Sequence, residues 1–112
     1  MLKKIKKFFD REQNLLIHII ASLCVLCLGI YFNVNSVEWF LLLLVIILVI
    51  SSELLNSSIE LAVDTYTSKY NALARVAKDS AAAAVLVSAI FALIIGLSIF
   101  LPKIIVLIKK NF

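Results

Sequence analysis

Cysteine, proline and glycine are scarce in this chain of 112 residues, which contains two, one and two of them respectively. Cys24 and Cys27 form a C-x-x-C pattern inside an apolar run, whereas redox pairs of this form lie at an exposed helix start. The two cysteines are therefore predicted to be packing residues, and no disulfide framework is expected. Residues 37–64 contain neither glycine nor proline, so nothing in this stretch interrupts a long helix.

Charged residues are also sparse, at 16% of the chain, while 63% of the residues are hydrophobic and the mean hydropathy is +1.10. A soluble domain is about half apolar, and a chain this short cannot bury the excess inside itself. The bilayer is therefore the expected solvent. The net charge is +4, from eleven cationic and seven acidic residues. The cations cluster at three points, a membrane pattern that gives no indication of a nucleic-acid groove.

The apolar stretches predict one all-α integral membrane domain, residues 1–112, with three membrane-spanning helices. The expected spans are residues 15–32, 37–64 (with a cytoplasmic extension) and 78–101. Asn35 and Glu38 form a capping-box pattern at the start of the second span, and Pro102 closes the third.

Two polar segments flank these spans. Residues 2–11 place apolar side chains at helical spacing between lysines, which predicts a short amphipathic helix on the anionic membrane surface. No small-x-small cleavage site follows the first apolar stretch, so we expect that span to be retained. A polar loop is expected over residues 65–77.

The positive charges set the orientation, because cytoplasmic segments carry the excess of Lys and Arg. Three spans put the two termini on opposite sides of the membrane. The N-terminal segment and the second loop, up to Lys78, hold eight cations, against three at the C-terminus. We therefore expect a multi-pass protein whose N-terminus is cytoplasmic.

Ionisable groups inside a span are costly and usually functional. Glu53, Asn56, Glu60 and Asp64 lie at positions i, i+3, i+7 and i+11, within one narrow face of a helix. Glu12, before the first span, and Lys78 with Asp79, at the start of the third, are expected to reach the same cytoplasmic depth. That level is where a water-soluble substrate and a membrane-dissolved substrate can meet.

Clustered carboxylates without His or Cys suit Mg²⁺ and not zinc. Phosphoryl transfer needs a metal on the phosphates, a cation for the developing charge and a base for the incoming hydroxyl, and this cluster supplies all three. The alternative is a structural set of inter-helix hydrogen bonds and ion pairs. His18, six residues from Glu12, is expected to be an interface histidine, and Ser57 and Ser58 are expected to be packing hydroxyls.

At these positions the sequence resembles a known family. Residues 53–64, E-L-L-N-S-S-I-E-L-A-V-D, are similar to the E-x-x-N-[ST]-x-I-E-x-x-V-D signature of the prokaryotic diacylglycerol kinase and undecaprenol kinase family. Residues 77–79, A-K-D, followed by A-V-L at 84–86, resemble that family's second block. Glu12, with Asn14, Ile17 and His18, is similar to its E-x-N-F-x-I-H entry to the first span.

The resemblance implies an ATP- and Mg²⁺-dependent kinase of the bacterial cytoplasmic (inner) membrane that phosphorylates diacylglycerol or undecaprenol. It also implies a homotrimer with sites completed between subunits. Glu53 would be the general base, and Glu12 and Glu60 would hold Mg²⁺ with the nucleotide. The remaining implied site residues are Asn56, Lys78 and Asp79, which position the phosphates and the metal shell, and Lys69, Tyr70 and Asn71 near the nucleotide.

Two other functions stay open at the level of sequence. A small transporter could use Glu53 and Glu60 as a proton or cation relay, although the polar stripe lies at one membrane edge and not at the midplane. A kinase-like scaffold could have lost nucleotide affinity, because the N-terminal helix is short for the family and Leu16 and Lys69 depart from its pattern. Small residues at every fourth position of the third span, from Ser80 to Gly96, predict a packing seam that needs a partner helix.

Overall fold

A computed structural model describes residues 1–11, 13–67 and 69–112, with the backbone alone for residues 7–11. The described part of the chain is built from four α-helices and contains no strand. The helices are α1 (Leu2–Arg11), α2 (Gln13–Tyr31), α3 (Ser36–Tyr66) and α4 (Ala72–Asn111).

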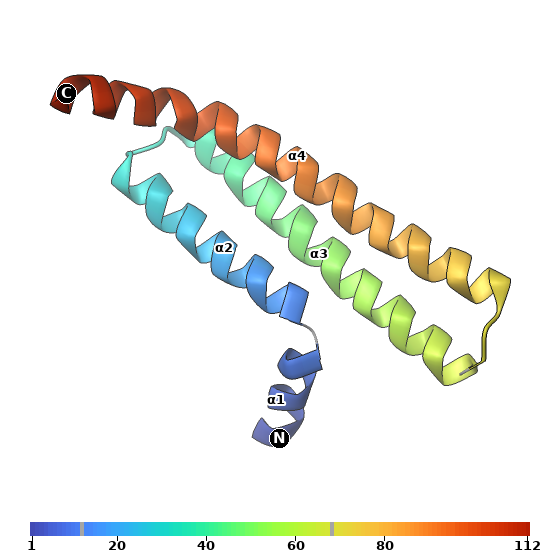
Figure 1. Cartoon of the computed structure of the whole chain (residues 1–112). Helices are drawn as coiled ribbons and strands as arrows, with labels where there is room; N and C mark the ends of the chain where they lie inside the picture. Colours follow the sequence, from blue (N-terminus) through green and yellow to red (C-terminus); the bar gives the residue numbers. More distant parts are fainter. Residues whose placement is uncertain (12, 68) are drawn as a thin grey trace.

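Helices α2, α3 and α4 lie side by side as an elongated antiparallel bundle, and α1 turns away from the start of α2 (Figure 1). The longest dimension is 59 Å. We call the end with the α2–α3 connection, residues 32–35, the turn end, and the end with the α3–α4 connection, residues 67–71, the loop end. Because α2 is short, the α3–α4 hairpin extends beyond it at the loop end (Figure 1).

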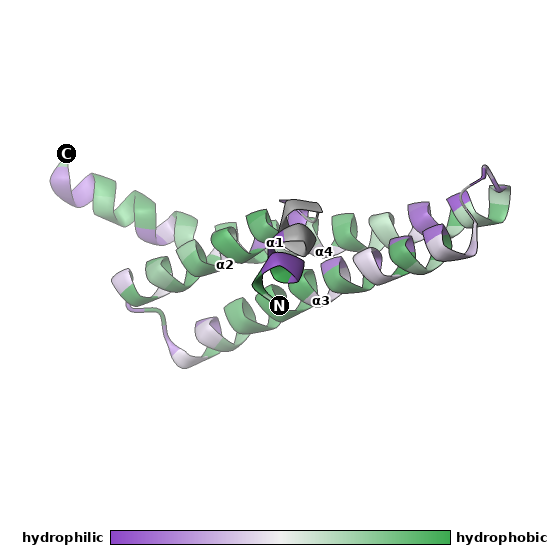
Figure 2. Cartoon of the chain, turned by 90° about the horizontal axis from the view of Figure 1, so that it is seen from below, coloured by the Kyte–Doolittle hydropathy of each residue, from purple (hydrophilic) through white to green (hydrophobic). Residues whose placement is uncertain are grey.

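Three of the helices, α2, α3 and α4, are long and apolar enough to cross a membrane. Between 11% and 28% of the residues in their most apolar windows are buried within the chain, so most of this surface needs another apolar environment. The hydrophilic residues gather on α1, at the loop end and near the C-terminus, with hydrophobic residues between them (Figure 2). The predicted fold class, three membrane-spanning helices and a short N-terminal helix, is confirmed.

The turn end contains the apolar core of the chain. Val34, Leu42, Ile99 and Phe100 are buried there, and the ring of Phe32 lies 6.1 Å from that of Phe100. A Cβ on Gly29 would come within 2.6 Å of the Trp39 indole, so only glycine permits this approach of α2 to α3.

Polar contacts close the turn end. The capping box is present: the Glu38 amide donates to Asn35 Oδ1 at 2.9 Å, and the Asn35 amide donates to Glu38 Oε1 at 3.1 Å. Asn33 has a φ of 55°, a left-handed conformation that asparagine tolerates better than most residues. Lys103 Nζ donates to Glu38 Oε2 at 2.8 Å and so ties α4 to the start of α3.

The prediction that Pro102 closes the third span is wrong. Helix α4 continues through Pro102 to Asn111, although proline cannot donate a backbone hydrogen bond. Ile99 and Phe100, before the proline, lie in the core, and Ile104, after it, packs against that core. These contacts and the Lys103–Glu38 pair hold both sides of the proline against α3, so packing outweighs one missing backbone bond.

The predicted loop over residues 65–77 is also too long. Helix α3 runs to Tyr66 and α4 begins at Ala72. Asn71 caps α4, since its side chain accepts hydrogen bonds from the amides of Leu73 and Ala74. This cap lets the helix start six residues before the predicted span.

Part of the small-residue seam of α4 packs against α3 of the same chain. Ser88 is buried, and its hydroxyl lies 2.8 Å from the hydroxyl of Ser52 on α3. Ser80 and Ala84, nearer the loop end, are exposed. The seam therefore joins α3 and α4 at its centre and leaves its loop-end part uncovered.

Candidate active site

The acidic stripe of α3 begins with a buried carboxylate. Glu53 is 2% exposed, which places an ionisable group inside the three-helix part of the bundle. Its contact is with α2, where His18 Nε2 lies 3.5 Å from Glu53 Oε2. A buried carboxylate is strongly disfavoured without such a polar partner. The fold thus keeps Glu53 in place by putting a histidine opposite it.

One turn further along α3, a carboxamide is only partly satisfied. Asn56 Nδ2 donates to Glu60 Oε1 at a long 3.4 Å. Asn56 Oδ1 is buried and has no hydrogen-bond partner among the described residues. Buried acceptors are rarely left unpaired, so this oxygen is a candidate contact for a ligand. Glu60 lies next to it and is partly exposed.

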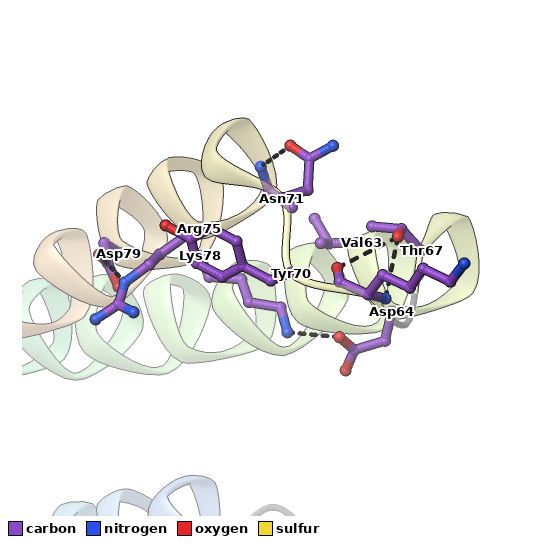
Figure 3. Close-up of a pocket in the computed structure, with 10 residues that line it drawn as sticks. Val63, Asp64, Thr67, Tyr70, Asn71, Arg75, Lys78 and Asp79 are labelled. Carbon is purple, nitrogen blue, oxygen red and sulfur yellow. Dashed lines mark hydrogen bonds and ion pairs between the residues drawn. The ribbon is translucent and has the colours of Figure 1, made fainter.

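The loop end holds a polar cavity of about 310 Å³. It is formed by the end of α3, the connection and the first two turns of α4 (Figure 3). The predicted site residues in its wall are Lys69, Tyr70, Asn71, Lys78 and Asp79. Asp64 and Arg75 also line it. Three cationic side chains in one wall suit an anionic ligand such as a polyphosphate.

Two ion pairs organise this cavity. Lys78 Nζ donates to Asp64 Oδ1 and so bridges α4 and α3 (Figure 3). Arg75 Nε lies 3.8 Å from Asp79 Oδ2 within α4, and both side chains are more than two-thirds exposed. Pairs this exposed add little stability, so a charged ligand can compete for these side chains at small cost.

A second, apolar cavity of about 440 Å³ lies between α2, α3 and α4. His18 and Ser22 are its polar members, and it extends along the bundle toward Phe100 and Ile104 at the turn end. One of its lining residues, His18, contacts the buried carboxylate of Glu53, which does not itself line the cavity. An apolar chain could therefore lie in this cavity with a polar head beside His18.

The structure brings some predicted site residues together and separates others. Glu60 contacts Asn56, and Lys78 contacts Asp64. Lys78 does not reach Glu53 in one chain, since Asp64 lies eleven residues, or roughly 16 Å, further along α3. The expectation that all these groups share one depth is therefore wrong for a single chain. Glu12 lies outside the described residues, and within them no three acidic, histidine or cysteine side chains form a metal site.

Sequence reasoning missed two members of this arrangement. His18 was interpreted as an interface histidine, yet it contacts Glu53. The spacing of α2 contained the signal: Leu15, His18, Ser22 and Gly29 recur at helical intervals, and Leu15 and Gly29 are buried. Arg75 was counted only as a loop cation, although it lines the polar cavity.

Comparison with known proteins identifies the family. Residues 2–100 match the family described as prokaryotic diacylglycerol kinase. The chain belongs to this family. It is 46% identical to undecaprenol kinase from Bacillus subtilis over 82% of the chain and 75% of that protein. It is 37% identical to diacylglycerol kinase from Synechocystis over 84% of the chain, and 44% identical to that of Helicobacter pylori over 65%.

The chain spans 54% and 56% of the length of these two diacylglycerol kinases. Family and relatives agree that this is a membrane lipid kinase, whose reaction is ATP-dependent phosphoryl transfer. The transporter and scaffold alternatives are not favoured, because the family and these named relatives are kinases.

Proposed function

We propose that this kinase transfers the γ-phosphoryl group of ATP to the hydroxyl group of undecaprenol, with Glu53, near the middle of α3, as the general base. The observation that carries the proposal is that His18, which lines the apolar cavity, contacts the buried Glu53 carboxylate. The lipid chain would occupy the cavity, and its hydroxyl would lie at Glu53. A base held there can remove the hydroxyl proton as the oxygen attacks phosphorus.

The nucleotide would bind further out, in the polar cavity. Its wall carries Lys69, Arg75 and Lys78, which can neutralise the phosphates, and Tyr70 and Asn71 lie beside them. Asp79 would release Arg75 and take part in the metal shell, as the family resemblance implies. Positioning and charge neutralisation of this kind supply most of the rate enhancement in phosphoryl transfer.

The donor set at Asn56 and Glu60 fits Mg²⁺. This ion prefers oxygen ligands and is usually bound through one or two carboxylates together with substrate phosphates. The buried Asn56 Oδ1 lacks a partner among the described residues and lies next to Glu60. We propose that Glu60 and Glu12 hold the ion with the nucleotide and that Asn56 completes the surrounding shell. The ion would withdraw charge from the phosphates.

The choice of undecaprenol over diacylglycerol rests on similarity, since identity is highest, at 46%, with the undecaprenol kinase among the relatives compared. The test is transfer of radiolabelled phosphate from ATP to each lipid in mixed micelles. We expect a higher kcat/KM for undecaprenol. Equal or better turnover of diacylglycerol would overturn this assignment and leave the kinase activity intact.

We also propose a homotrimer in the bacterial cytoplasmic membrane with the loop end in the cytoplasm. The separation of Lys78 from Glu53 within one chain and the exposed loop-end seam support sites shared between subunits. The eight-to-three distribution of cations supports the orientation. A reporter fused after Phe112 should be active only outside the cytoplasm, and cytoplasmic activity would reverse the orientation.

A further inference from the structure

The proposed reaction so far gives His18 no part, although its imidazole contacts the general base Glu53. His18 Nε2 and Glu53 Oε2 are 3.5 Å apart, and the two side chains differ in exposure, 25% for His18 and 3% for Glu53. A proton taken up by Glu53 is therefore enclosed by protein. The adjacent imidazole is a proton acceptor and is less enclosed.

Helix α2 holds this imidazole in a fixed place. Leu15, one turn before His18, is 3% exposed, and Gly29 at the other end of the helix packs directly under Trp39. The Ser22 hydroxyl donates to the His18 carbonyl at 2.7 Å, within the same helix. The ring is thus carried by a helix that is anchored on both sides of it.

The surroundings of His18 leave Glu53 as its charged neighbour. Across the cavity, α4 presents Ala89, Ala92 and Leu93, which do not titrate. The next acid on the described part of α3 after Glu53 is Glu60, seven residues or roughly 10 Å further on. Lys78, on α4, is paired with Asp64 beyond that. Within the described residues, the charge state of His18 is therefore coupled first to Glu53.

We propose that His18 is a positioning residue for Glu53 and receives the proton that Glu53 takes from the lipid hydroxyl. This rests on the proposed function. As the lipid oxygen bonds to the γ-phosphorus, the bond from phosphorus to the β–γ bridging oxygen breaks and its electron pair leaves with ADP. The hydroxyl proton passes to Glu53, then to Nε2 of neutral His18, and then to water. Glu53 returns to the carboxylate for the next turnover.

The main test compares His18→Gln with Ile17→Gln. Glutamine at position 18 keeps a polar contact to Glu53 but cannot carry the proton onward. Ile17 is 60% exposed, so the control adds the same side chain one residue earlier on an outward face. We expect kcat of His18→Gln to fall roughly tenfold to a hundredfold, with KM for ATP and lipid unchanged, and Ile17→Gln to retain wild-type kcat.

The pH profile separates a proton-accepting role from a structural one. Because an imidazole can take up a proton and a glutamine amide cannot, the pH dependence of kcat should differ between the wild type and His18→Gln. If His18→Gln does not fold, His18→Ala assayed with added imidazole serves instead, and its rate should rise with imidazole concentration.

Three outcomes would overturn the inference: a wild-type kcat and pH profile in His18→Gln, an effect confined to KM, or no imidazole rescue of a folded His18→Ala protein. The proposed function fails separately. It fails if the wild-type protein phosphorylates neither lipid. If the wild type is active and the His18 variants behave as it does, only the inference about His18 fails.

Discussion

The turn end and the loop end of the bundle differ in how far their polar groups are paired within the chain. At the turn end the polar groups are paired: Asn35 with Glu38, and Glu38 with Lys103. Aromatic and aliphatic side chains fill the space between the helices there. Toward the loop end, one turn beyond Glu53, an acceptor of Asn56 is buried and unpaired among the described residues, and at the loop end itself charged side chains face an open cavity.

From this difference we infer a structural role for the turn end and a ligand-binding role for the loop end. Contacts at the turn end fix how α2, α3 and α4 are arranged, and that arrangement carries Glu53 and His18 to their contact two to three turns away. The unsatisfied groups at the loop end are left for ligands and, in the proposed trimer, for a neighbouring chain. Changes at the loop end should therefore alter chemistry without altering stability, and changes at the turn end should do the reverse.

The largest effect is expected at Glu53. Glu53→Gln keeps the shape of the side chain but removes its ability to accept a proton, so kcat should fall about 10²- to 10⁴-fold. Binding of Mg·ATP, measured by equilibrium dialysis, should stay near wild type. Glu60→Gln is the matched comparison on the same helix face and should weaken Mg·ATP binding, because a proposed metal ligand is lost. Retention of more than about a tenth of the rate in Glu53→Gln would remove its role as base.

The next prediction concerns sites shared between chains. Glu53→Gln and Lys78→Leu should each be inactive alone. If the two residues serve one site from different chains, mixed assemblies contain sites with both residues intact, and part of the activity returns. Each variant mixed with wild type gives the reference for subunit exchange. Exchange without recovered activity would show that both residues act from the same chain.

The comparison also separates what the sequence could predict from what it could not. The spans, the capping box at Asn35 and the acidic stripe follow from hydropathy and helical spacing within one segment. The continuation of α4 through Pro102 does not, because it depends on core contacts of Phe100 and Ile104 with distant helices.

The same limit applies to the site. Spacing placed Glu53 and Glu60 on one face of α3, and the family pattern assigned roles to them. The contact of His18 with Glu53 depends on how α2 is rotated against α3, and that rotation is set by the approach of Gly29 to Trp39 at the other end of α2. The spacing of residues in one helix predicts which face is buried, but it does not predict which residue of another helix packs against that face.

A smaller effect, on stability alone, is expected from Gly29→Ala. The added Cβ would lie 2.6 Å from Trp39 Cη2 and should cost about 1–3 kcal/mol through overpacking. Gly96→Ala is the control, since its Cβ meets nothing within 4 Å and both changes gain the same helix propensity. Thermal unfolding in detergent, followed by circular dichroism, should show a lower Tm for Gly29→Ala than for Gly96→Ala. Equal Tm values would mean that the Gly29–Trp39 contact does not constrain the bundle.

The smallest effect is expected from the Glu38–Lys103 pair. Its side chains are 20% and 28% exposed, and the bond is 2.8 Å long. Glu38→Gln keeps an oxygen for the Asn35 amide and so preserves the capping box, while the charge that Lys103 meets is lost. We expect a smaller fall in Tm than in Gly29→Ala, because ion pairs near the surface add little stability.

The position of the Lys103 pair next to Pro102 sharpens this test. Pro102 has no amide hydrogen, so α4 lacks one of its own backbone hydrogen bonds there, and the Lys103 pair should help to hold the segment after it against α3. In Glu38→Gln, amide hydrogen exchange should accelerate over residues 103–111 and stay unchanged over the loop-end residues of α3. The double variant Glu38→Gln/Lys103→Gln should lose less stability than the sum of the single losses, because each single change already breaks the pair. Strict additivity, with unchanged exchange after Pro102, would show that core packing alone carries α4 past the proline.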